Sequence, residues 1–165
     1  MVPLTLLAAQ KVATTLNAGS ALQQQLANLA NTCGVSVPVL TPAQVVLSSA
    51  TPDMGDKDIQ LTYPRICLYS VGLKNTQGEK FRSLSGSIVV VAEVWASANM
   101  VSETDQWIHF YVEAMTDVLR RNIGDWGDGV FFSGAYDVQF QPPKTGGIGY
   151  VQSAKVTCTF AVSQN

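Results

Sequence analysis

The pattern of hydrophobic and polar positions predicts a long strand followed by a long helix in the middle of this chain. The run from Ser83 to Ser97, SLSGSIVVVAEVWAS, is apolar on both alternating faces at its centre, which is typical of a central strand covered on both sides. The segment after it, SETDQWIHFYVEAMTDVLRRNIG, repeats apolar residues every three or four positions. It predicts a helix over residues 102–123, with Ser102 and Asp105 in the positions of a capping box.

The same periodicities predict the other elements. Two helices are expected within residues 1–34: Pro3–Asn17, and a second helix from a Ser20 cap to Asn31 that is closed by Gly34. Further strands are expected at Gln44–Ser48, Ile59–Ser70, Val130–Gln141 and Val151–Ser163. The order is helix, helix, three strands, helix, two strands. We therefore expect a single α+β domain over residues 1–165, with a mostly antiparallel twisted sheet within 44–163 and helices packed against it.

The composition adds a hint of assembly. Hydrophobic residues make up 47% of the chain, but charged residues make up only 13%, about half the usual share. Because interface cores are depleted of charge, this favours a protein with partners, although a monomer with an uncharged polar surface fits the composition nearly as well. The net charge is −2 and the basic residues are scattered, so a dedicated grip on nucleic-acid phosphates is not expected.

Cysteines and the N-terminus point to an intracellular setting. The three cysteines, Cys33, Cys67 and Cys158, are widely spaced and form no CxxC motif, so we expect small buried thiols and neither a disulfide framework nor a zinc site. The apolar N-terminal run lacks a basic start and is interrupted by Gln10 and Lys11, unlike a signal peptide. No stretch is long enough to cross a bilayer, and a soluble protein without membrane contact is predicted.

Candidate catalytic and metal-binding groups are sparse. His109 and Glu113 lie one helical turn apart but no further ligands complete a metal site, so we interpret them as a surface pair. The aspartates of DMGDKD lack the spacing of a calcium loop, and the glycines of Lys144–Gly149 precede a strand instead of a helix, which indicates a hairpin and not a phosphate loop. We expect no catalytic residues, no metal and no cofactor.

Glu93 is the one unusual carboxylate, since it interrupts an apolar central strand. It could act as a general acid, but it has no partner carboxylate in the sequence pattern. We favour a structural pairing with an arginine or a place at a subunit interface, for which Arg120 and Arg121 are further candidates. The last strand has a polar, threonine-rich face that is suited to solvent, a lumen or a wet interface.

The whole arrangement resembles the phage tail terminator (tail completion) proteins. The resemblance covers about Leu4 to Val162 and rests on the leading helix, YPRICLYSVG, SGSIVVVAEVWAS, a helix ending in LRR and a closing pair of strands around GGIGYVQSAKVTCTFAV. It implies a homohexameric ring without catalytic residues, which caps the completed tail tube, stops its polymerisation and provides the surface that joins the head. It also implies a place in the virion after assembly in the host cytoplasm, with DNA passing through the lumen without sequence-specific binding.

The implied partners are the tail tube protein and the head–tail connector or neck proteins. Candidate contacts with adjacent rings lie on two loops, Gly72–Arg82 and Gln141–Gly149, at Lys74, Asn75, Gln77, Lys80, Arg82 and Lys144. Candidate contacts between subunits are Glu93, Arg120 and Arg121, and Gln44–Ser48 is a candidate edge strand for pairing with a neighbour.

Three other functions stay open. The doubled N-terminal helix, Pro3–Asn31, is longer than a minimal terminator requires, which leaves room for a neighbouring neck, collar or connector protein. A tail tube subunit would differ by stacking identical rings without limit. A small ligand-binding or enzymatic α+β domain would need a concave site with convergent polar groups, and the sequence marks none. The size of the purified protein separates a monomer, a finite ring and a polymer.

Overall fold

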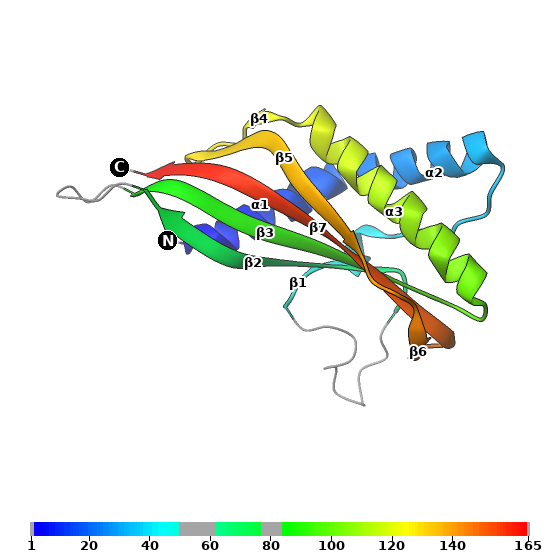
Figure 1. Ribbon diagram of the computed structural model, residues 1–165. Helices are drawn as coiled ribbons and strands as arrows, with labels where there is room; N and C mark the ends of the chain where they lie inside the picture. The colour runs from blue at the N-terminus through cyan, green and yellow to red at the C-terminus, as the bar shows by residue number, and fades with distance from the viewer. Residues whose placement is uncertain (1, 50–61, 77–83, 165) are drawn as a thin grey trace.

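The computed structural model describes residues 2–49, 62–76 and 84–164 as a single α+β domain, as the sequence predicts. The helices are α1 (Leu4–Asn17), α2 (Ala21–Cys33) and α3 (Val101–Arg121). The strands are β1 (Val45–Leu47), β2 (Arg65–Asn75), β3 (Leu84–Ala98), β4 (Gly124–Asp125), β5 (Val130–Phe140), β6 (Lys144–Gly146) and β7 (Gly149–Gln164). The three helices lie on one side of a twisted sheet (Figure 1).

The sheet has the strand order β1-β2-β3-β7-β5-β4, and β6 continues the pairing of β5 along β7. Only β1 and β2 are parallel among the described strands, and every other described pair is antiparallel, so the prediction of a mostly antiparallel sheet is confirmed. Strand β3 lies between β2 and β7, which confirms that the run around Val90 is a central strand.

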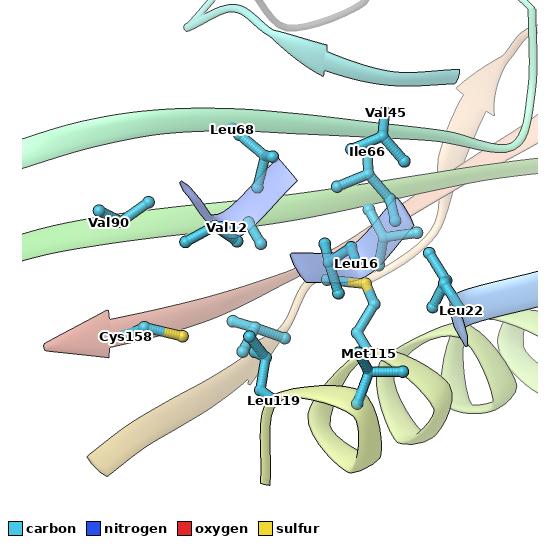
Figure 2. Close-up of a cluster of buried hydrophobic side chains, with 14 of the residues drawn as sticks. Val12, Leu16, Leu22, Val45, Ile66, Leu68, Val90, Met115, Leu119 and Cys158 are labelled. Atoms are coloured by element: carbon cyan, nitrogen blue, oxygen red, sulfur yellow. The ribbon is translucent and has the colours of Figure 1, made fainter. Parts of the chain in front are cut away.

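One apolar core fills the space between the helices and the sheet. Figure 2 shows side chains of α1, α2 and α3 meeting those of the strands in one cluster. Its labelled members are Val12, Leu16, Leu22, Val45, Ile66, Leu68, Val90, Met115, Leu119 and Cys158. Each large side chain that is fully buried in this way contributes about 1.5–3 kcal/mol. Because the apolar sides of α1, α2 and α3 and one face of every long strand enter the same cluster, the chain forms one domain.

Strand β2 extends further than predicted. It begins at Arg65 and continues to Asn75, whereas the sequence suggested a loop from Gly72; residues 59–61 of the predicted strand lie outside the described residues. The pairing with β3 shifts between Ser70 and Gly72 and then resumes, with Gly72 opposite Val89. Glycine alone is therefore a poor stop signal here, because the long β3 still offers a partner for each following residue. Strands β4 and β6 were not predicted, since two or three residues are too few to show a period.

Two of the predicted helix caps are wrong. Ser20 precedes α2 in the left-handed region, with φ 60°, and its side chain caps nothing. The capping box at 102–105 does not form: α3 begins at Val101, and Asp105 Oδ1 accepts a hydrogen bond from Gln152 Nε2 at 3.1 Å. The Asp105 carboxylate therefore ties α3 to β7 instead of satisfying the helix's own amides. Gly34 does close α2, as predicted, with φ 66° and its amide bonded to helix carbonyls.

Candidate functional site

The face of the sheet that carries no helix is hollowed at one end. The hollow has a volume of about 330 Å³ and lies between the buried part of β3 and the segment that links β5 to β7. It is lined by Glu93, Trp95, Gln141, Pro142, Pro143, Lys144, Val151, Ser153 and Lys155. The candidate Glu93 of the sequence analysis thus lies in the deepest polar position that this face offers.

Glu93 is 2% exposed and is held by a tyrosine on the neighbouring strand. The Tyr69 hydroxyl donates a hydrogen bond to Glu93 Oε2 at 2.9 Å, and Lys155 lies opposite Glu93 in the register of β7. Burial raises the pKa of Tyr69 above its ordinary value, and the bond to Glu93 raises it further, so the phenol stays a donor. Among the described residues no arginine forms an ion pair with Glu93, and Tyr69 supplies its hydrogen bond. The place of Glu93 at a subunit interface stays a prediction.

Trp95 and Lys144 form the outer part of the hollow. The Lys144 ammonium lies 5.2 Å from the centroid of the Trp95 ring, within the range of a cation–π contact. Lys144 lies on β6 opposite Val151, and Gly146 and Gly149 pair at the end of this hairpin, as the glycine pattern predicted. A residue expected on a free loop is therefore held against the sheet by an aromatic ring.

The described lining of this hollow combines a carboxylate, two ammonium groups, a hydroxyl and an indole. The Ser153 hydroxyl forms no hydrogen bond to a base within the described residues, so a Ser–base pair is not assembled there. Glu93 is the only carboxylate in the described lining. What the lining provides is two ammonium groups, a carboxylate and an indole around one small concave space.

His109 lies on the exposed polar stripe of α3, as predicted, and its ring is 4.5 Å from that of Phe140 on β5. Both line a hollow of about 320 Å³ together with Cys33, Glu113 and the apolar side of α2. Within residues 2–49, 62–76 and 84–164, no group of three His, Cys, Asp or Glu side chains could hold a metal. The aspartates of DMGDKD lie outside the described residues.

The cysteines differ from one another. Cys67 and Cys158 are buried, as expected, and burial raises the pKa of the Cys158 thiol to about 12. Cys33 is exposed at the end of α2, so the prediction of a buried thiol is wrong at this position. Cys33 is the last residue of α2, whereas the expectation of burial rested on the apolar strands that contain Cys67 and Cys158.

The two edges of the sheet are each covered over only part of their length. At one edge β1 pairs with Ile66–Leu68 alone, and no described strand continues along Ser70–Asn75. Val71 and Leu73 on this half are 56% and 49% exposed. At the other edge β4 pairs with Phe131 and Phe132, and no described strand follows along Tyr136–Phe140. We call these two segments the β2 half-edge (Ser70–Asn75) and the β5 half-edge (Tyr136–Phe140).

Each half-edge carries a single charge, and the two charges are opposite. Lys74 is the one charged residue of the β2 half-edge, and Asp137 is the one charged residue of the β5 half-edge. Both side chains are exposed, and neither forms an ion pair with another described residue. Unpaired strand edges are templates for another chain, and opposite charges across a strand pair stabilise it.

The remaining predicted contact residues are spread over the molecule. Lys74 and Asn75 lie on β2 instead of on a loop, and Gln77, Lys80 and Arg82 lie outside the described residues. Among the described residues, Lys74 and Asn75 lie far along the sheet from Lys144, which pairs with the start of β7.

Arg120 and Arg121 lie at the exposed end of α3. They form ion pairs with Asp117 at 3.3 and 2.8 Å, and Arg120 also pairs with Glu113 at 3.2 Å. The hydrogen bond to Glu113 raises the pKa of Arg120, and the charge of Tyr136 on β5 contributes to the same effect. Its role between subunits stays a prediction.

The sequence analysis did not identify the β5 half-edge as an uncovered edge of the sheet. The alternation in Val130–Gln141 predicts the strand, and Val130 and Phe132 are buried on the predicted face. Which half of the strand keeps a free edge depends on where β4 pairs, and no local pattern contains that information.

Neither the models of protein families nor the curated protein sequences give a match to this chain. No helix in the described part of the chain is both long and apolar enough to span a membrane.

Proposed function

We propose that this chain is a structural protein of a phage tail that forms a ring on the tail tube, ends its polymerisation and presents the surface that joins the head. The observation that carries the proposal is the pair of half-edges, which lie at the two opposite edges of one sheet. The resemblance of the sequence to tail terminator proteins supplies the particular role and the expectation of six copies.

The two half-edges differ from each other, so an interface that joins them is heterologous. Heterologous interfaces generate closed rings when the rotation closes and open filaments when it does not. The strands β2, β3, β7 and β5 alternate in direction, and β2 and β5 are therefore antiparallel. A neighbour in the same orientation consequently adds its β5 to β2 as an antiparallel strand, the pairing that the rest of the sheet already uses.

The sheet face without helices suits the inside of such a ring. Thr159, Ala161 and Ser163 of β7 are exposed on it, and Thr157 is half-buried. The charged residues of the same face are of both signs and include Lys74, Lys144, Lys155, Glu93 and Asp137. A lining that grips phosphates would need several basic side chains on one face. The net charge of −2 for the whole chain is compatible with the passage of DNA through such a ring.

A small ligand-binding domain is the second candidate, and the hollow beside Glu93 is the observation that favours it. The hollow is concave and brings Lys155, Ser153 and Trp95 together. A neck or connector protein and a tube subunit share the ring argument with the terminator. They differ from it in what the ring contacts and in whether rings stack.

The test is the mass of the purified protein, alone and mixed with tail tubes. A terminator forms a finite ring on tube ends and prevents their further growth, even if it is a monomer in dilute solution. Stacked rings of this chain alone would identify a tube subunit. A protein that neither binds tube ends nor forms a closed ring there contradicts the proposal.

A further inference from the structure

We infer that neighbouring copies of this chain pair the β2 half-edge with the β5 half-edge in one register, in which Lys74 lies opposite Asp137 of the next copy. The inference rests on the ring in the proposed function and specifies its interface. It requires no particular partner other than a second copy of this chain.

The first step is the level of each half-edge within the sheet. Across the four long strands, Tyr69, Val91, Thr157 and Asp137 form one row. Lys74 belongs to a different row, with Ser87, Ala161 and Phe131. Val91 and Ser87 are four positions apart on β3, so Lys74 lies four residues along the strand direction from the row of Asp137. The half-edges are thus diagonally opposite and not level.

The second step is that a closed sheet needs such an offset. Strands in a barrel tilt by about 35–45° from the axis, and the register must stagger to allow this tilt. In an eight-stranded barrel a tilt of about 36° goes with a total stagger of about eight residues, or about one residue for each strand. Each copy of this chain contributes four long strands, β2, β3, β7 and β5, to a common sheet. A stagger of about four residues between copies of four strands therefore corresponds to about one residue for each strand, as in the eight-stranded barrel.

The third step is the set of pairs that this stagger creates. Lys74 meets Asp137 on the face without helices, since their row partners Ser87 and Thr157 are both on that face. Leu73 then meets Val138 on the helix-covered face, where their partners Ile88 and Val156 are both fully buried. One opposite-charge pair and one apolar pair therefore form together, and each keeps to one face of the sheet.

Other registers lose the charge pair. A slip of one residue would turn the side chains of one strand to the wrong face. A slip of two residues keeps the faces but sets Lys74 against Gln139 and removes the charge pair. The faces of the sheet therefore exclude a slip of one residue, and the charge pair distinguishes the proposed register from a slip of two.

The experiment uses disulfide cross-linking between copies in the full chain. Cys33 is exposed and is first replaced by Ser, because it would otherwise cross-link. Lys74→Cys and Asp137→Cys are then combined in one chain; directly opposed residues of an antiparallel pair have Cα atoms about 4.5–5.5 Å apart, within disulfide reach. The matched control combines Lys74→Cys with Gln139→Cys, which lies on the same face two residues away. Each single cysteine variant is a second control.

Mild oxidation is carried out under the conditions in which the assembly forms, with its mass measured in parallel. The expected result is a covalent ladder from the 74/137 variant, ending at a finite number of chains, with at least tenfold less ladder from the 74/139 variant and none beyond dimers from single variants. Equal ladders from both pairs, or rings of the right mass without cross-links, would overturn the register while leaving the ring intact. The absence of any ring from the protein, alone and with tube ends, would overturn the proposed function and the register together.

Discussion

The two faces of the sheet are built from the same strands but differ in how completely their side chains are buried. On the helix-covered face of β3, Ile88, Val90, Ala92 and Val94 are at most 1% exposed and complete a dry core. On the other face, Glu93 is buried with a tyrosine partner, while Thr159 and Ala161 further along β7 are exposed. The first face needs nothing beyond the chain itself. The second face and the two half-edges are where the molecule has surface left for something else, and substitutions should separate the two roles.

The largest effect is expected in the covered face. Phe160 is fully buried, with its ring 5.1 Å from that of Phe132 and 5.0 Å from that of Trp126. Replacing Phe160 by Ala should lower the free energy of unfolding by about 3–5 kcal/mol, because a large buried side chain leaves a cavity. Denaturant unfolding measures it. Thr159→Ala, the adjacent exposed position, is the control and should change the free energy by no more than about 0.5 kcal/mol.

A smaller loss is expected on the face without helices. Tyr69→Phe removes the donor to Glu93 Oε2 and keeps the ring, so the buried carboxylate loses a hydrogen bond. The free energy of unfolding should fall by about 1–3 kcal/mol in the same denaturant experiment. If Glu93→Gln together with Tyr69→Phe costs as much as the two single variants added, the hydrogen bond is not what couples them.

The pH dependence should show the same contact. Burial and the bond to Glu93 raise the pKa of Tyr69 in the folded state above that of the unfolded chain. A raised pKa contributes stability below the unfolded value of about 10, and this contribution is lost as pH rises beyond it. The stability of the unmodified protein should therefore decline more steeply between pH 9 and pH 11 than that of Tyr69→Phe. Tyr111, whose pKa is also raised by burial, stays in both proteins and cancels. Identical slopes would contradict the assignment.

The smallest effect on stability, and a specific effect on assembly, is expected at the half-edges. Lys74→Asp should leave the free energy of unfolding within about 0.5 kcal/mol, because Lys74 is an exposed side chain. Its assembly should weaken, because two like charges then face each other across the interface. Adding Asp137→Lys to the same chain restores opposite charges and should restore assembly. Light scattering at a series of concentrations measures the assembly of each variant. If the double variant assembles no better than Lys74→Asp alone, the result argues against this pairing.

The elements with long periods could be predicted from the sequence. The stripe of α3 through Ile108, Val112 and Met115 is buried as expected, and β3 is central, because many consecutive residues carry the same signal. The extension of β2 to Asn75 could not be foreseen, since it depends on the partner that β3 offers beyond Gly72. Local propensity is overruled there by pairing with a distant strand.

The candidate site was predicted only in part. The burial of Glu93 follows from its place in an apolar strand. Its partner Tyr69 could not be predicted, because the residue that faces Glu93 from the adjacent strand is set by the register between β2 and β3, which no local pattern encodes. The half-edges are a property of the whole sheet for the same reason. Lys74 was singled out for its charge, while its place on a partly covered edge of the sheet only emerges from the topology.

The most direct test of the account is the mass of the oxidised Cys33→Ser, Lys74→Cys, Asp137→Cys protein after any non-covalent contacts are removed by denaturant. The account predicts that the ladder ends in one closed species of six chains, each of 17.7 kDa. The species should be absent from the 74/139 control. A ladder that continues without limit would indicate a filament or a stacked tube, and a product that stays monomeric while the native protein assembles would contradict the joining of the two half-edges.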